Sequence, residues 1–197
     1  MVDGEKPIRS FIAVEVGDEV TQALAEAQAT LKRSLYFSTF RWVAPENIHI
    51  TLKFLGDVLP SQLGTVKAAL ASIAPRHALF RLTATDLGVF PTLNRPSVLW
   101  VGLQGEMTQL QNLRDDVEQV IAPLGFPTES RPFSPHLTLA RLKDPSRAEV
   151  EALRDVLRHD PVGMLGEIGV AEISLMQSEL SPRGPRYTRL AQFELGE

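Results

Sequence analysis

The sequence predicts a duplicated fold of mixed helices and strands, arranged as two lobes. Segments with strand character alternate with amphipathic helical segments along the chain. The sequence also matches itself at an offset of 87 residues, which places His49-Ile50-Thr51 on His136-Leu137-Thr138, since 136 − 49 and 138 − 51 both equal 87. Two copies of one helix-and-strand unit would account for both observations.

The elements of the first half follow from local patterns. An apolar, β-branched segment predicts a buried strand, and Asp18 can cap the helix after it. Pro45-Glu46-Asn47 predicts a turn between a pair of strands, and Gly56 and Asp57 are expected to end the second of them. The predicted elements are a strand over 8–16, a helix over 18–35, strands over 40–43 and 49–55, and a helix over 61–73.

The second half shows the same alternation. Ser146 and Glu149 have the spacing of a capping box, which predicts a helix containing Val150, Leu153 and Val156. Two more strands are expected to close the chain. The other predicted elements are strands over 80–87 and 97–103 around a turn region with Pro91, Asn94 and Pro96, and a helix over 106–121.

The offset divides the chain into two units, about 10–96 and 97–183. Residues 10–16 overlay 97–103, which in turn overlay 184–190. One strand, 184–195, is left over and is expected to close the second lobe. We therefore expect a single domain, spanning 1–197, made of two intertwined lobes.

Composition narrows the function. With 197 residues and 44% hydrophobic residues the chain can build a packed core. The absence of cysteine excludes disulfides, thiol nucleophiles and thiolate metal sites. The chain has no run of about 18 apolar residues and begins with a polar segment, so we expect no membrane segment and a cytoplasmic protein.

The formal net charge of −4 provides no overall attraction for a polyanion. A nucleic acid would therefore have to be held by a local basic cluster or engaged only at its end. Extended duplex binding is not expected.

The two His-x-Thr motifs are the strongest functional signal. Side chains alternate along a strand, so His49, Thr51 and Lys53 should share one face, as should His136 and Thr138. If the lobes are related by a pseudo-twofold axis, two imidazoles and two hydroxyls would surround one phosphate. One histidine could act as general base and the other as general acid, while the threonines donate hydrogen bonds to phosphate oxygens. This chemistry requires no metal.

The segments from His49 to Gly56 and from Ser134 to Arg141 closely resemble the paired motifs of the two-histidine (2H) phosphoesterases. Residues 9–13 and 41–47 extend the resemblance to the RNA 2′,3′-cyclic phosphodiesterase branch, historically called 2′-5′ RNA ligases. The resemblance implies an α+β bilobal fold with two antiparallel sheets lining a central groove and helices outside. It also implies that neither a metal nor a nucleotide cofactor takes part.

By the same resemblance, the reaction is hydrolysis of a terminal 2′,3′-cyclic phosphate to a 2′-phosphate. His49 would be the proton donor to the departing 3′ oxygen and His136 the proton acceptor from water; the residues themselves do not order these two roles. The expected partner is a single-stranded RNA end with a cyclic phosphate, such as that of tRNA halves, bound by a monomer.

Four further residues and one cluster of arginines are candidates for contacts with RNA. Arg141 could bind phosphate, but regular alternation turns it away from His136 unless the strand ends or bulges there. Lys53 could hold a neighbouring phosphate. Phe133 and Phe11 could stack on the terminal base, although core packing suits Phe11 better. An arginine cluster, Arg183, Arg186 and Arg189, could steer RNA toward the groove.

His77 and His159 have no histidine at the equivalent repeat position, so both are interpreted as exposed and without a catalytic role. Three alternative functions remain open. The same groups could hydrolyse small cyclic nucleotides or 2′-5′ linked oligonucleotides, could join tRNA halves through a 2′-5′ bond, or could only bind phosphate without catalysis.

Overall fold

The computed structural model describes residues 5–159, 162–181 and 184–196. Within them the helices are α1 (Asp18–Ser34), α2 (Pro60–Ile73), α3 (Met107–Ile121) and α4 (Arg147–His159). The strands are β1 (Ile8–Glu15), β2 (Phe40–Trp42), β3 (His49–Val58), β4 (Phe80–Thr92), β5 (Arg95–Gly105), β6 (Leu137–Leu142), β7 (Gly166–Val170), β8 (Glu172–Ser181) and β9 (Gly184–Glu194).

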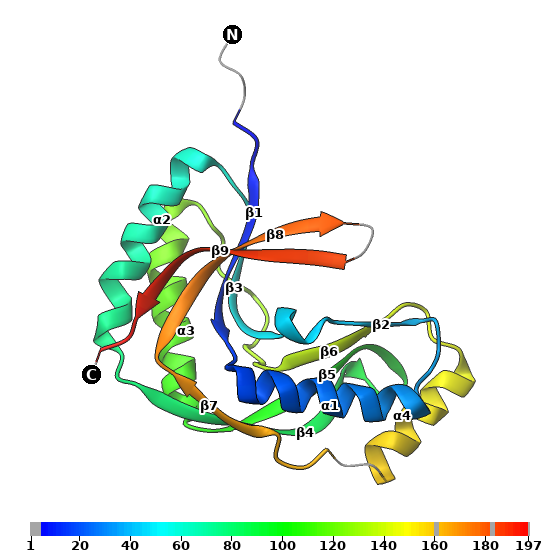
Figure 1. Cartoon of the computed structure of the whole chain (residues 1–197). Coiled ribbons are helices and arrows are strands. Elements are labelled where there is room, and N and C mark those ends of the chain that lie inside the picture. The colour runs from blue at the N-terminus through cyan, green and yellow to red at the C-terminus, as the bar shows by residue number, and fades with distance from the viewer. Residues whose placement is uncertain (1–4, 160–161, 182–183, 197) are drawn as a thin grey trace.

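The described strands form one curled, nine-stranded antiparallel sheet (Figure 1). Its order is β7-β4-β5-β6-β3-β1-β8-β9, with β2 paired to β6 beside this path. The expectation of two sheets was therefore wrong. The two halves meet where Ile50 of β3 pairs with Leu137 of β6, and this pairing joins strands that would otherwise be the inner edges of two sheets.

The two halves of the sheet exchange strands. β4 lies in the first repeat unit of the sequence, yet it pairs with β5 of the second. β8 lies in the second repeat unit and pairs with β1 of the first. The last strand, β9, pairs with β8 at the edge of the half that carries His49, so it does not close the other lobe as expected.

The helices cover the outer face of the curled sheet in two pairs. α2 packs against α3 beside β3 and β9, and α1 packs against α4 beside β7 (Figure 1). Each helix buries an apolar stripe, such as Leu24 and Leu31 in α1 and Leu110 and Val117 in α3. Burying one such side chain contributes about 1.5–3 kcal/mol. No helix of the described segments is long and apolar enough to span a bilayer.

Several local expectations were confirmed and others were wrong. The capping box exists: the Ser146 amide donates to Glu149, and the Glu149 amide donates to the Ser146 hydroxyl. The helix α1 is capped by Gly17, with Asp18 already in its first turn. Strand β3 continues through Gly56, which adopts φ 71°, a conformation that glycine tolerates.

Three further features of the strands differ from expectation: one pairing, the length of one hairpin and the number of closing strands. The strand β2 pairs with β6 and not with β3, because the Pro45–Asn47 segment forms a short helical turn that carries the chain away from a hairpin. The strands β4 and β5 extend to Thr92 and from Arg95, which makes a long hairpin. Three strands, β7 to β9, close the described part of the chain instead of two.

Candidate active site

A groove of about 850 Å³ lies where β3 and β6 meet. All four residues of the paired motifs, His49, Thr51, His136 and Thr138, line it. The remaining walls come from β2 and the following segment, from the end of β6, and from the β8–β9 hairpin, which extends beyond the rest of the sheet in Figure 1. Their lining residues include Arg41, Trp42, Phe54, Arg141, Leu180, Pro185 and Tyr187.

The register of the two central strands explains why the motifs meet. Ile50 and Leu137 are fully buried and pair with each other. Since the strands are antiparallel, the residues that flank this pair lie crosswise, His49 beside Thr138 and Thr51 beside His136. The predicted cluster of two imidazoles and two hydroxyls is therefore assembled around one point of the sheet.

The two histidines have matching hydrogen bonds. His49 Nδ1 lies 2.9 Å from the carbonyl oxygen of Asn47, and His136 Nδ1 lies 2.8 Å from that of Ser134. Because a carbonyl oxygen can only accept, Nδ1 carries the hydrogen in both rings. In each ring the other nitrogen, Nε2, is then available to a ligand in the groove.

Aromatic side chains fix the planes of both imidazoles. Phe11 stacks on His49 with ring centroids 4.7 Å apart, and Tyr187 meets the same ring edge-on at 5.3 Å. Phe90 meets His136 edge-on at 5.0 Å. The rings are therefore held from the side as well as through Nδ1.

Burial lowers the pKa of both histidines below the ordinary value, and the two backbone hydrogen bonds oppose this only in part. The Glu15 carboxylate also favours the protonated form of His49, whereas Arg141 disfavours it in both rings. The surroundings of the two histidines therefore differ, although their motifs match.

A bulge in each central strand decides which side chains enter the groove after the threonines. Residue pairing skips Leu52 in β3 and Leu139 in β6, which are equivalent positions of the two repeats. The extra residue reverses the alternation. As a result, Phe54 and Arg141 point into the groove. The bulge in β6 is the irregularity that Arg141 needs in order to face the same way as His136.

The same bulge makes the expectation for Lys53 wrong. Lys53 points into the core, where its side chain has no exposed surface and its ammonium donates to Glu118 at 2.6 Å and to the Pro127 carbonyl at 2.8 Å. Lys53 therefore cannot hold a phosphate in the groove.

Neither predicted stacking residue lines the groove. Phe11 is only 3% exposed and lies beneath His49, so it supports the ring and is not open to a base. Phe133 packs against Arg114 of α3, whose guanidinium carbon lies 5.5 Å from the ring centroid. The groove instead offers Phe54, Trp42 and Tyr187, which the sequence interpretation did not select.

The predicted arginine cluster is not a single surface. Arg183 lies outside the described residues, and Arg186 is exposed. Arg189 binds Glu15 through Nε at 2.8 Å and through Nη2 at 2.9 Å. Arg189 is therefore committed to a carboxylate and is not free to steer RNA.

The remaining two histidines lie apart from the groove lining. His159 is exposed at the end of α4, as expected. His77 is partly buried and pairs with Asp116 at 3.0 Å, so its expected exposure was wrong.

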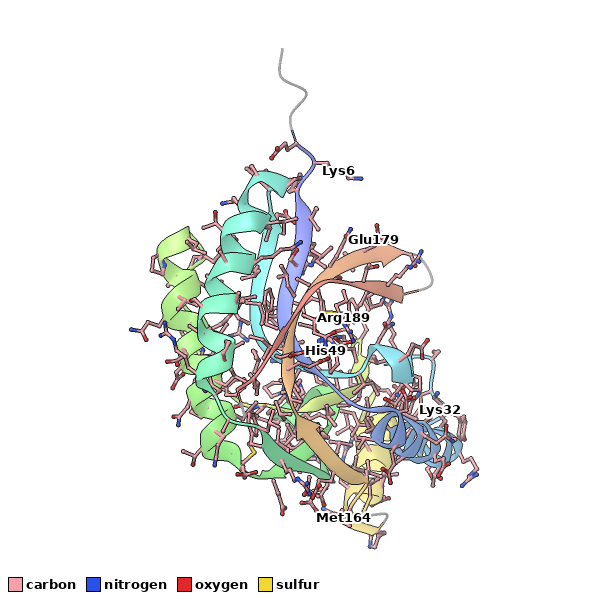
Figure 2. All side chains as sticks on the ribbon, turned by 60° about the vertical axis from the view of Figure 1, so that its left-hand side comes forward. Lys6, Lys32, His49, Met164, Glu179 and Arg189 are labelled. Carbon is pink, nitrogen blue, oxygen red and sulfur yellow. The ribbon has the colours of Figure 1, made fainter. Side chains whose placement is uncertain are left out.

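Sequence reasoning missed a carboxylate beside the first histidine. Glu15 lies directly across from His49 in the β1–β3 pairing, and both line a second, smaller pocket of about 260 Å³ with Arg189. Figure 2 shows His49 and Arg189 close together near the middle of the molecule. Burial raises the pKa of Glu15, but the hydrogen bonds from Arg189 and Ser174, together with the charges of Arg189 and His49, lower it by more and keep the carboxyl charged. The residue at its equivalent position is Gly102, and this break in the repeat was the available signal.

Comparison with known proteins agrees with this site. The model of the family described as LigT-like phosphoesterases matches the chain twice, over residues 14–100 and 101–187. An RNA 2′,3′-cyclic phosphodiesterase of Aquifex aeolicus is 35% identical over 97% of this chain and 99% of its own length. One from Aeropyrum pernix is 40% identical over 75% of this chain and 82% of its own length.

Solved structures show the same fold. The crystal structure of TT0787 from Thermus thermophilus has a TM-score of 0.80 at 33% identity and covers 96% of this chain and 99% of that one. The crystal structure of Escherichia coli LigT with 3′-AMP has a TM-score of 0.76 at 26% identity, covering 97% and 99%. The chain belongs to the LigT-like phosphoesterase family.

Proposed function

We propose that this protein hydrolyses the 2′,3′-cyclic phosphate at the end of an RNA strand to a 2′-phosphate. The observation that carries the proposal is the matched pair of histidines, each with Nδ1 bound to a backbone carbonyl and Nε2 left for one shared groove. The names of the relatives from Aquifex aeolicus and Aeropyrum pernix support this reaction.

In the proposed mechanism a water molecule attacks phosphorus as the bond to the 3′ oxygen breaks. Neutral His136 accepts the proton of the water at Nε2, and protonated His49 donates a proton from Nε2 to the departing 3′ oxygen. Thr51 and Thr138 donate hydrogen bonds to the non-bridging oxygens, and Arg141 balances the charge that accumulates there. These side chains supply both proton transfers, so the scheme includes no metal.

The charges around the two rings support this order of roles. Glu15 favours a protonated His49, as an acid requires, and no carboxylate has this effect on His136 in the described structure. The related Escherichia coli LigT has been crystallised with 3′-AMP, a nucleotide of the kind that the groove would have to hold.

Replacing either histidine tests the proposal. We expect His49→Ala and His136→Ala each to lower the hydrolysis rate of a cyclic-phosphate-ended oligonucleotide by about 10²–10⁴-fold, because each removes a general acid or base. The oligonucleotide should still bind. The measurement is single-turnover hydrolysis in excess chelator, with His159→Ala as the matched control on an exposed histidine.

Full activity in both variants would disprove the two-histidine mechanism, and a strict metal requirement of the native protein would do the same. Binding without hydrolysis by the native protein would instead favour a phosphate-binding module. Joining of tRNA halves is tested in the same assay by following 2′-5′ linked product, and hydrolysis should dominate because water is the more abundant nucleophile.

A further inference from the structure

Two arginines lie side by side in the groove, one on each of two paired strands. Arg41 of β2 is the direct partner of Arg141 of β6 in the antiparallel pairing. Directly opposed residues project from the same face of a sheet with Cβ atoms about 5 Å apart. Both arginines line the groove, so their guanidinium groups share one wall.

The local structure of β2 determines the direction of the Arg41 side chain. Its neighbours Phe40 and Trp42 stack with ring centroids 6.1 Å apart and pack toward the core, Phe40 buried and Trp42 half-buried at the border of the groove. Alternation then directs Arg41 to the groove. The position of Arg41 is a consequence of the strand and not of a freely moving surface loop.

Neither arginine has a carboxylate partner within the residues that the structure describes. Other arginines do, among them Arg114, Arg154 and Arg189. Like charges placed directly opposite each other destabilise a sheet. Two adjacent arginines without carboxylate partners are suited to bind an anionic group of a ligand.

The two arginines are on different strands. Arg141 is on β6, which also carries Thr138, whereas Arg41 is on the neighbouring strand β2, which pairs with β6 from Ala140 to Leu142. Arg141 therefore shares a strand with a group expected to hold the reacting phosphate, and Arg41 lies one strand to the side. The charge of Arg141 also lowers the pKa of both histidines, after the larger effect of burial.

We propose that Arg41 binds the phosphodiester that precedes the cyclic phosphate in an RNA strand, so that the groove contacts two consecutive phosphates. This inference rests on the proposed function. A cyclic phosphate carries one negative charge, and Arg141 with Thr51 and Thr138 already provides its counter-charge and donors. The second guanidinium requires a second anion, and the neighbouring internucleotide phosphate is the anion that an RNA end supplies. A local site of this kind also suits a chain whose net charge is −4.

The test compares three substrates that end in a 2′,3′-cyclic phosphate. They are a dinucleotide with a phosphodiester linkage, the same dinucleotide with a neutral methylphosphonate linkage, and a mononucleotide. For the native protein, kcat/KM should be about tenfold higher on the phosphodiester than on the methylphosphonate, mainly through KM. In Arg41→Gln this ratio should fall to about one, and Arg41→Lys should restore part of it.

Salt dependence provides an independent readout. The slope of log kcat/KM against log salt for the phosphodiester dinucleotide should become less steep by about 0.7 in Arg41→Gln, as expected when one phosphate contact of a single strand is lost. Arg158→Gln is the matched control, because Arg158 faces Asp155 on α4 and is not among the groove residues. That variant should keep the native ratio and slope.

Three outcomes would overturn the inference. The native protein could hydrolyse both dinucleotides equally well, Arg41→Gln could keep the native ratio, or Arg41→Gln could lower kcat/KM equally on both, which would place Arg41 at the reacting phosphate. Failure of the proposed function is a different result, since the native protein would then hydrolyse none of the three substrates. Thermal unfolding of each variant identifies a loss caused by misfolding.

Discussion

His49 and His136 have the same hydrogen bond but different charged neighbours. Glu15 lies across from His49, and the equivalent residue in the second repeat is Gly102. Arg141 stands where the first repeat has Phe54. The motif could be predicted from sequence because both copies are contiguous. The influence of Glu15 on His49 could not, because it depends on the pairing of β1 with β3.

The lowered pKa values predict an acidic shift of the activity profile. The proposed mechanism needs His49 protonated and His136 neutral, so kcat/KM should be bell-shaped and report the pair of groups. Both pKa values are lowered in the free protein, so the maximum should lie below about pH 6.5, the ordinary pKa of histidine. Initial rates at subsaturating substrate across pH 4.5–9 measure it, with about 0.3 pH steps adequate to resolve the limbs.

Glu15→Gln should move this maximum to still lower pH. Glu15 raises the pKa of His49, so its loss lets burial and Arg141 lower that pKa further, and less His49 is protonated at neutral pH. Glu15→Asp should keep the native profile more closely. An unchanged profile in Glu15→Gln would show that the carboxylate does not act on His49.

At the scale of single elements, alternation predicts the face of each side chain correctly before the bulges and wrongly after them. Alternation places His49, Thr51, His136 and Thr138 correctly because no irregularity interrupts those residues. One residue later the pairing skips Leu52 and Leu139, and the faces reverse. The sequence around Leu52 gives no local sign of a bulge, so alternation predicts the wrong face for Lys53.

A buried amide supports the bulge of β6. Gln28 of α1 donates from Nε2 to the carbonyls of Val43 and Leu139, at 2.8 and 3.0 Å. We expect Gln28→Leu to lower the free energy of unfolding by about 1–3 kcal/mol, because the Val43 carbonyl loses its side-chain donor and the Leu139 carbonyl keeps only the Val43 amide. Urea denaturation measures this loss.

The control for this prediction lies on the same helix. Gln22 is exposed on α1 and bonds only to Glu26 within the described structure, so Gln22→Leu should change stability by less than about 0.5 kcal/mol. Similar losses in the two variants would show that the effect belongs to the helix and not to the carbonyls at the bulge.

At the scale of the whole molecule, buried Lys53 ties β3, the strand that carries His49, to helix α3 and to the segment that follows it. Lys53 follows His49 in β3 and holds both Glu118 and the carbonyl of Pro127, in the segment that leads to His136. Lys53→Met should lower the free energy of unfolding by about 1–3 kcal/mol, because Glu118 keeps only Arg114 as a counter-charge and the Pro127 carbonyl loses its donor. Guanidinium denaturation measures the loss.

The double variant Lys53→Met/Glu118→Leu should recover part of this stability, because the buried Glu118 carboxylate is gone and Arg114 still has Asp115 as a partner. If the double variant is no more stable than Lys53→Met alone, the loss comes from the contact with Pro127 and not from the charge. Both outcomes leave the histidines unchanged, so activity measured below the unfolding transition reports how far this link aligns them.

The arrangement of the sheet was the least predictable level. The order of helices and strands followed from periodicity, turns and caps, and the repeat followed from the offset. Whether two halves stay apart or join depends on one contact between Ile50 and Leu137, far apart in sequence. Local patterns do not contain such a pairing.

The exchange of β4 and β8 has a consequence for a chain that holds only one repeat. Such a chain could complete neither half of the sheet by itself, since its outer strand belongs to the other half. It would have to exchange strands with an identical copy. The symmetry of that dimer would then give the two histidines, one from each copy, identical neighbours. Joining the copies in one polypeptide removes that constraint. Only then can one imidazole acquire a glutamate and the groove an arginine on one side alone.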